Sequence, residues 1–258
     1  MSTTAAHPRI RAGRIEVQRD EGRRRLRKLV VAGVAAGTLA ALWGLAMTPL
    51  LDVDHIRVTG AASTGPEAVA AATGIELGDA LVTTRLGAAA DRVARLPWVE
   101  TVDVSRRWPG TIQVEVVERR PVAAVPAKAG GWVLLDAAGR QLAVQPELPP
   151  GLLKVELAAV DAAPGQLIAA DASPVLELAV SRPPALQDRL LALRPASGGT
   201  VEGTVTVGPD RQATVVFGAP TQATAKWLAL LSILDGIDPT GLTRIDVRVP
   251  SAPALTRR

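Results

Sequence analysis

The longest hydrophobic run in the chain extends from Leu29 to Leu51 and contains no charged residue. An α-helix rises about 1.5 Å per residue, so a helix over this run is long enough to cross a hydrocarbon core of about 30 Å. No other stretch of the sequence is both as long and as apolar. The pattern therefore predicts one transmembrane helix over 29–51, with a short tail over 1–28 before it and a large extramembrane region after it.

Immediately after the span, the sequence has the period of two residues that is typical of half-buried strands. Val53 to Thr59 alternates apolar and polar positions, and so do the segments 101–105 and 111–116. The last two are separated only by the short turn around Trp108-Pro109-Gly110, which predicts a hairpin. We expect Trp98 and Val114 to be buried in the core of this unit.

Two short helices are predicted between the first strand and the hairpin. In Thr64-Gly65-Pro66-Glu67, Thr64 has the side chain of an N-cap, Pro66 lies early in the first turn, and Gly74 can close the helix. A second helical period begins near Thr84 and ends at Pro97, since proline interrupts helical hydrogen bonding. The order strand-helix-helix-strand-strand allows two helices to cover one face of a small sheet.

Beyond Pro121 the pattern predicts a mostly antiparallel β domain with helices, so the fold class is α+β. A helix is expected from about 221 to 235, with an apolar stripe formed by Trp227, Leu230, Leu231 and Leu234. The last predicted strand is 244–249, because Pro250 and Pro253 oppose further pairing. The predicted organisation is tail 1–28, transmembrane helix 29–51, first domain 52–120, β domain 121–250 and C-terminal tail 251–258.

Charge predicts the orientation of the span. The residues before Leu29 include nine Lys or Arg and three acidic residues, a net charge of +6, whereas the whole chain carries +4. Basic flanks stay in the cytoplasm, which places the N-terminus inside and the large region outside. A cleaved signal peptide with a site at Gly44-Leu45-Ala46 is the alternative, but the apolar run is longer than a signal core.

The chemistry of the sequence argues against an enzyme. The chain has no cysteine and two histidines, and it lacks the glycine-rich phosphate loops and the serine motifs of common enzyme classes. Its excess positive charge lies in the juxtamembrane tail, where we interpret it as facing lipid rather than nucleic acid. We therefore predict no catalytic, metal or cofactor site, no nucleic-acid partner and no small-molecule substrate.

One further pattern lies inside the predicted span. Gly33 and Gly37 have the G-x-x-x-G spacing that allows two membrane helices to approach closely. Alanine and glycine are abundant throughout this chain, so the spacing also fits its general composition. Helix packing through Gly33 and Gly37 is thus one hypothesis beside a compositional explanation.

The first extramembrane unit resembles the POTRA (polypeptide-transport-associated) domain of the FtsQ/DivIB family of bacterial cell-division proteins. The similarity covers the tail, the span, this unit and the region that follows. It is carried by three runs, which are Leu96-Pro97-Trp98-Val99, Arg106-Arg107-Trp108-Pro109-Gly110-Thr111 and Val114-Glu115-Val116-Val117-Glu118-Arg119-Arg120-Pro121-Val122-Ala123. The resemblance implies a POTRA-like domain over 52–120 followed by the family's β domain.

The resemblance also implies a function. It implies a non-catalytic scaffold in the cytoplasmic membrane at the division septum, with FtsB (DivIC in some bacteria), FtsL and other division proteins as partners. The final strand is where this family meets its partners, and a strand near the chain end often lies at an open sheet edge. The expected partner-binding residues are Arg244, Ile245, Asp246, Val247, Arg248 and Val249.

An alternative function is a POTRA-type module for envelope protein transport or assembly. That use would require a C-terminal barrel of alternating strands of about ten residues. The chain ends too soon for such a barrel, and the one predicted span is a helix. The scaffold is therefore the favoured hypothesis.

Overall fold

The computed structural model describes residues 27–41, 43–44, 52–168, 172–208, 211–236, 238 and 240–258. Its contacts divide the chain into two compact units. The first consists of the residues up to Arg57 together with Ile75–Arg85 and Ser105–Gln113, and the second of Val58–Gly74, Leu86–Val104 and Val114–Arg258. Helices accompany a small sheet and a large, mainly antiparallel sheet, which is the α+β class that the sequence predicts.

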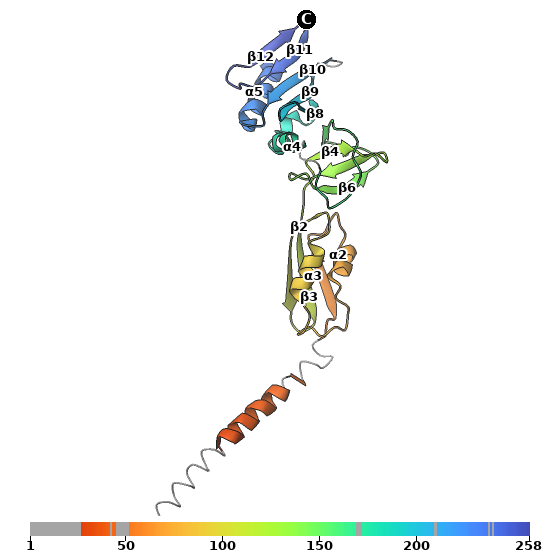
Figure 1. Ribbon diagram of the computed structural model, residues 1–258, viewed down its shortest axis with the longest axis vertical. Helices are drawn as coiled ribbons and strands as arrows, with labels where there is room; N and C mark the ends of the chain where they lie inside the picture. Colours follow the sequence, from red (N-terminus) through yellow and green to blue (C-terminus); the bar gives the residue numbers. More distant parts are fainter. Residues whose placement is uncertain are drawn as a thin grey trace, which may run out of the picture. The chain divides into compact units, whose positions relative to one another are not determined.

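Residues 27–41 and 43–44 are helical (Figure 1). Their side chains are exposed, for example those of Leu29, Leu39 and Trp43. Residue 42 and residues 45–51 of the predicted span lie outside the described residues, as does the predicted tail up to residue 26. Within the described part of the chain, no helix combines the length and the apolar character that crossing a bilayer requires.

The predicted order strand-helix-helix-strand-strand is confirmed after Asp52 (Figure 1). The three strands form a sheet in the order β1-β3-β2, so the two strands of the predicted hairpin are neighbours. Ile112, Val114 and Val116 alternate into the core from β3 and leave Val117 in solvent. The elements are β1 His55–Thr59, α2 Pro66–Thr73, α3 Leu86–Val93, β2 Val99–Arg107 and β3 Thr111–Glu118.

The ends of helix α2 confirm one predicted cap and correct the other. Gly74 closes the helix in the left-handed conformation at φ 58°, which a residue without Cβ adopts at little cost. At the start, the N-cap is Gly65 and no side chain caps the helix. The Thr64 hydroxyl instead donates to a carboxylate oxygen of Glu118 at 3.0 Å. The Thr64 side chain therefore binds the distant residue Glu118 instead of capping α2 as the local sequence motif predicted.

Glu118 holds the turn before α2 through its carboxylate. The backbone N–H groups of Ser63 and Thr64 donate to it at 2.8–3.0 Å, in addition to the Thr64 hydroxyl. Burial alone would raise the pKa of Glu118, but these hydrogen bonds to the ionised form outweigh burial and lower the pKa below its ordinary value. The ionised carboxylate therefore favours the folded state.

This shift predicts an acid-sensitive contribution to stability. Glu118 stabilises the fold above the ordinary glutamate pKa of about 4.3, and the effect is lost as pH falls through the lower folded pKa. Glu118→Gln should lose less stability than the unmodified chain between pH 7 and pH 3, by less than about 1 kcal/mol because water screens the site. Urea unfolding of both chains at the two pH values measures this, and equal losses would contradict it.

The second, larger sheet contains nine strands in the order β12-β11-β10-β9-β8-β7-β4-β5-β6. Five of the neighbouring pairs are antiparallel, and β10/β11, β4/β7 and β7/β8 are parallel. The strands are β4 Ala123–Pro126, β5 Trp132–Leu135, β6 Gln141–Gln145, β7 Leu153–Val155, β8 Leu190–Ala196, β9 Thr200–Gly208, β10 Arg211–Gly218, β11 Leu242–Asp246 and β12 Ala254–Arg257. The accompanying helices are α4 Ser173–Val180, the 3-10 helix η3 Pro184–Leu186 and α5 Ala223–Gly236.

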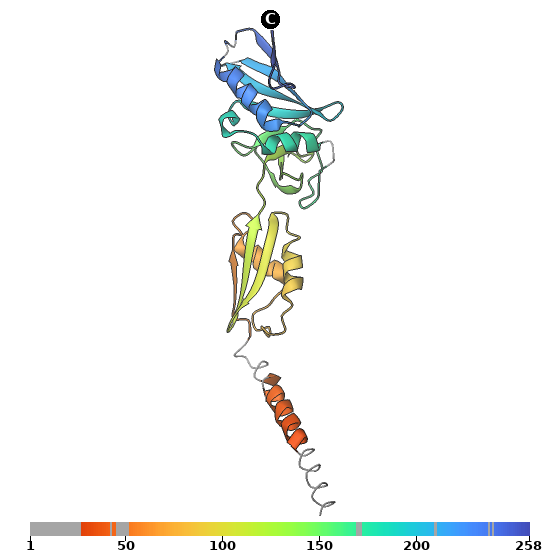
Figure 2. The same ribbon diagram turned by 90° about the vertical axis from the view of Figure 1, so that its left-hand side faces the viewer.

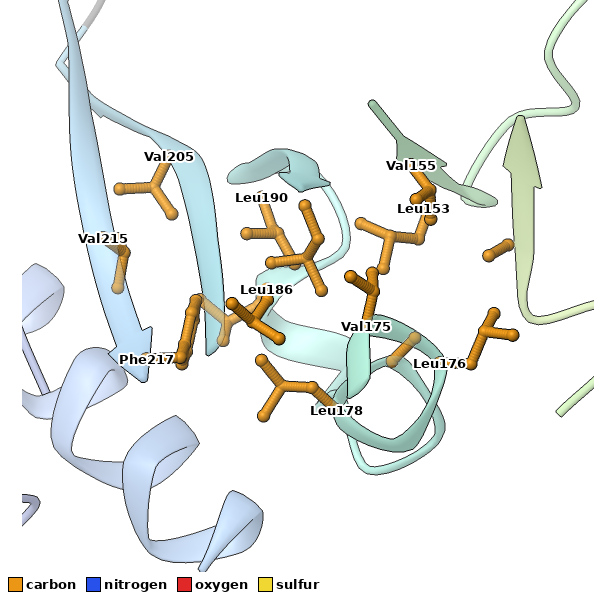
Figure 3. Packing of buried hydrophobic residues seen from close by; sticks show 14 of the residues in the cluster. Leu153, Val155, Val175, Leu176, Leu178, Leu186, Leu190, Val205, Val215 and Phe217 are labelled. Carbon is orange, nitrogen blue, oxygen red and sulfur yellow. The ribbon is translucent and has the colours of Figure 1, made fainter. Parts of the chain in front are cut away.

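One extended core joins these helices to the large sheet (Figure 3). The rings of Phe217 on β10 and Trp227 on α5 meet edge to face, with 4.6 Å between their centroids. The indole N–H of Trp227 donates to the carbonyl of Leu178 on α4 at 3.2 Å, so the buried ring keeps a hydrogen-bond partner. Helix α5 thereby lies across one face of this part of the sheet (Figure 2).

Two predictions about buried residues are only partly correct. Trp227 and Leu230 are fully buried on α5, but Leu231 and Leu234 are only partly buried beside the same core. Val114 is fully buried as predicted, whereas Trp98 is partly exposed. Trp98 packs instead against a small cluster formed by Ala124, Leu134 and Leu142, which lie in the segment after β3.

Candidate functional site

The strand predicted to close the chain is neither the last strand nor an edge strand. Strand β11 covers Leu242–Asp246 and pairs on both sides, in parallel with β10 and antiparallel with β12. Residues 247–249, which were expected to extend it, lie in the connection to β12. The prediction that Arg244 to Val249 forms an open edge is therefore wrong, because the chain turns back and adds one more strand.

The open edge at this end of the sheet belongs to β12 (Figure 1). Its inner side pairs with β11 in the register Arg244↔Thr256, Ile245↔Leu255 and Asp246↔Ala254. No strand of the described chain pairs with its outer side. Outward-facing N–H and C=O groups of an edge strand are available to a strand from another protein.

The edge at the opposite end of the sheet differs because another segment covers part of it. The N–H of Gln141 on β6 donates to the carbonyl of Gln166 at 2.8 Å, and the N–H of Gly165 donates to the carbonyl of Gln141 at 2.7 Å. Arg140 and Leu167 form a further bridge. Of the two ends of the large sheet, β12 is thus the one without such a cover in the described residues.

The six predicted partner-binding residues separate into two groups. Ile245 and Val247 are fully buried, so their side chains belong to the core. Arg244 and Arg248 are exposed, and Asp246 is partly exposed between them. A strand over 244–249 would place Val249 on the same side as Ile245, since alternate side chains share a face, but Val249 is 58% exposed because it follows the end of the strand. Only the exposed members present side-chain chemistry to a partner.

Both exposed arginines have an acidic partner within the chain. Arg248 forms a salt bridge with Asp246 at 2.7 Å, and its guanidinium hydrogen bond lowers the pKa of Asp246 and raises its own pKa. Arg244 lies 3.6 Å from a carboxylate oxygen of Glu202, which also pairs with Arg194 on β8. These pairs are in contact with water, so a new acidic partner can compete for the guanidinium groups at low cost.

The surface has a groove next to the C-terminal end of β11. A groove of about 620 Å³ lies between the start of α5 and the connection that follows β11. Its walls are residues 222–225 on one side and Arg248, Val249, Pro250 and Ser251 on the other. The exposed Val249 therefore lies on a concave surface, close to the polar Arg248.

The structure does not test the predicted helix-packing site at Gly33 and Gly37. Gly33 and Gly37 lie in the described helix, and a Cβ atom added to either glycine would meet nothing within 4 Å. Their role in helix packing stays a prediction. Among the residues that the structure describes, no cluster of three His, Cys, Asp or Glu side chains is placed to hold a metal ion.

Strand β12 is the candidate binding element that the sequence pattern missed. Leu255 is partly buried between the exposed residues Ala254 and Thr256, a weak alternation that could have indicated a strand. Pro250 and Pro253 concealed this signal, because prolines oppose a continuous strand. In the structure both prolines lie in the connection, so they separate β11 from β12 without interrupting either.

Comparison with known proteins gives the family. Residues 51–119 match the family described as "POTRA domain, FtsQ-type". The chain is 33% identical to the cell division protein FtsQ of Streptomyces bingchenggensis, over 90% of this chain and 87% of that protein. It is 30% identical to FtsQ of Streptomyces venezuelae, over 88% and 82% of the two chains, and 31% identical to FtsQ of Streptomyces collinus, over 90% and 89%. The chain therefore belongs to the FtsQ family of cell division proteins.

Proposed function

We propose that this protein is a non-catalytic scaffold of the bacterial division machinery, anchored in the cytoplasmic membrane by residues 29–51 and acting at the septum. Relatives that match most of its length are cell division proteins, which supports a role in division. The observation that carries the scaffold role is the open outer side of β12 at one end of the large sheet. An edge strand offers binding to another chain without any reacting group.

The proposed partners are single-span division proteins of the FtsB (DivIC) and FtsL type. A partner strand would add to β12 and extend the sheet through backbone hydrogen bonds. Arg257 and Arg258 are exposed at this edge, and Arg244 and Arg248 are exposed beside it. Four guanidinium groups in one region favour a partner segment with acidic side chains, since charge-assisted hydrogen bonds are stronger than neutral ones.

Within this proposal, the predicted residues have different tasks. Arg244, Asp246, Arg248 and Val249 would contact the partner from the surface beside the edge. Ile245 and Val247 would act by holding β11 against the core, because both side chains are fully buried. Strand β12 becomes the principal contact and takes the place that the sequence assigned to 244–249.

The cellular test is the position of a fluorescent fusion in dividing cells. A scaffold of the division machinery should concentrate at the septum, and a second fusion that lacks residues 254–258 should lose this position if partners hold it there through β12. A module for envelope protein transport would instead be distributed around the cell. An even distribution of the complete chain would contradict the proposed function.

Membrane topology is a separate prediction, which the absence of native cysteine makes simple to test. With a tail of net charge +6 retained in the cytoplasm, Ser251→Cys should react with a membrane-impermeant maleimide in intact cells and Ser2→Cys should not. Ser2→Cys should react only after the cells are opened. Labelling of Ser2→Cys but not Ser251→Cys in intact cells would show the reverse orientation.

A further inference from the structure

Three large apolar side chains are exposed on loops of the first compact unit. Leu77 is 68% exposed, Trp108 is 59% exposed and Val82 is 38% exposed. Leu77 and Val82 lie in the loop over 75–85, and Trp108 lies in the turn between β2 and β3. We name these three side chains the proximal tip. Much of their apolar surface is left in contact with solvent, which favours a role in binding another apolar surface.

Backbone hydrogen bonds hold both loops around residues 52–55, where the chain enters its first folded domain. Val53 and the 75–85 loop exchange two bonds, from the N–H of Val53 to Asp79 at 2.8 Å and from the N–H of Gly78 to Val53 at 2.9 Å. The N–H of Asp54 donates to Gly110 at 2.7 Å. The proximal tip is therefore built around the point at which the chain arrives from the apolar helix.

Two further contacts fix the loops in place. The guanidinium of Arg106 donates to the carbonyl of Leu81 at 2.7 Å and thereby ties the hairpin to the 75–85 loop. At Gly110 an added Cβ atom would crowd the Asp54 carboxylate and the Asp52 carbonyl, so the absence of a side chain allows the turn to approach residues 52–54 closely. These interactions hold the two loops that carry Leu77, Val82 and Trp108.

Chain length places this surface close to the membrane if the helix is inserted. Seven residues, 45–51, connect Gly44 at the end of the described helix to Asp52. If residues 29–51 span the bilayer, as the proposed function has it, Asp52 is the first residue outside the membrane. The loops that clasp residues 52–55 then lie next to the bilayer surface.

The charges around the proximal tip balance. The three segments 52–57, 75–85 and 105–113 contain four acidic residues and four arginines, which are Asp52, Asp54, Glu76, Asp79, Arg57, Arg85, Arg106 and Arg107. A neutral surface is neither attracted to nor repelled by anionic lipids. Contact with the membrane would then depend on the apolar side chains, and tryptophan has a preference for the interface between headgroups and acyl chains.

We propose that the proximal tip inserts Leu77, Val82 and Trp108 into the interfacial region of the outer leaflet of the cytoplasmic membrane. This insertion would fix the first domain against the bilayer. This inference rests on the membrane anchoring in the proposed function. The proximal tip binds the lipid surface itself, because the loops follow directly after the membrane-spanning residues. Their lack of net charge suits insertion by apolar contact. The effect would be to set the height and orientation at which the rest of the chain meets its partners.

The experiment uses the full-length chain reconstituted in phosphatidylcholine vesicles. Leu77→Cys and Trp108→Cys provide single sites for an environment-sensitive fluorophore, since no native cysteine competes. Leu228→Cys on α5 is the control, because Leu228 is 59% exposed and lies far along the chain. Nitroxide-labelled lipids should quench the labels at 77 and 108 at least about twofold more than the label at 228. Equal quenching at all three sites overturns the proposal.

Two additional measurements distinguish a failure of the membrane anchor from a failure of the proximal tip. A label at Ala40→Cys reports insertion of the helix, so lipid quenching at 40 without quenching at 77 and 108 overturns the proximal tip while anchoring stands. Absence of quenching at 40 overturns the anchoring and the tip together. In vesicles containing phosphatidylglycerol the quenching at 77 and 108 should be unchanged. Quenching that requires this anionic lipid, or the addition of a partner protein, overturns insertion by apolar contact.

Discussion

Val114→Asp is expected to unfold the first domain. Val114 is fully buried on β3, between the equally buried Ile112 and nearly buried Val116. An aspartate there would place an unpaired carboxylate among apolar side chains, which costs several kcal/mol, a large part of the stability of a small domain. Thermal unfolding of residues 52–258, followed by circular dichroism, should show the loss of one transition or a strongly lowered Tm.

Strand β3 also supplies the matched control. Val117 is on the same strand but 56% exposed, so Val117→Asp introduces the same side chain into water. It should change the free energy of unfolding by less than about 1 kcal/mol. If Val114→Asp melts like the unmodified chain, or if Val117→Asp is the more destabilised of the two, the orientation of β3 is incorrect.

Arg119→Met is expected to cost about 3–5 kcal/mol, because it leaves a buried carboxylate without its cation. The Asp136 side chain is only 6% exposed, and one of its oxygens lies 2.9 Å from the Arg119 guanidinium. Its other oxygen accepts the N–H groups of Ala138 and Arg140 in the turn before β6. Arg119 also donates to the carbonyl of Val99 at 3.1 Å, so methionine loses a second contact.

A double-mutant cycle isolates the ion pair from these other contacts. Asp136→Asn removes the charge but keeps an oxygen for the two turn N–H groups. Denaturant unfolding should show that Arg119→Met together with Asp136→Asn is less destabilised than Arg119→Met alone. Additive losses, with no coupling between the two substitutions, would mean that the pair does not contribute through charge.

The sequence predicted the first domain well because its signals are local. The alternation in β3 and the short turn after Arg107 define a hairpin without reference to the rest of the chain. Thr64 is the exception, since its hydroxyl binds Glu118, which is 54 residues away in the sequence. No local motif reports a partner at that separation, so the capping prediction failed while the position of the helix was correct.

The candidate site was predicted less well, and the reason is again physical. Whether β11 is an edge or an interior strand depends on whether another strand follows it. That strand, β12, has four residues and follows two prolines, so its periodicity is too short to recognise. The apolar positions Ile245 and Val247 are the buried side of the segment, as a period of two implies, but that period does not show that Val249 lies beyond the strand.

The most direct test of the partner-binding account concerns the outer side of β12. The N–H of Arg258 donates to the carbonyl of Gly241 at 2.8 Å, toward β11. Successive residues of a strand point their N–H groups in opposite directions, so the N–H of Arg257 faces the open side. Proline is tolerated at an edge where the N–H faces solvent. Arg257→Pro therefore removes an outward donor and keeps the pairing with β11, and Arg257→Ala keeps the donor and removes the side chain.

The measurement is the Kd of residues 52–258 for the extracytoplasmic segment of the FtsB-like partner, with circular dichroism confirming that both variants fold. Strand addition to β12 predicts at least a tenfold weaker complex for Arg257→Pro, about 1.4 kcal/mol. Arg257→Ala should lose less than about 1 kcal/mol, as expected for an exposed charge. Equal Kd values for Arg257→Pro and the unmodified chain, with both folded, would contradict binding at this edge.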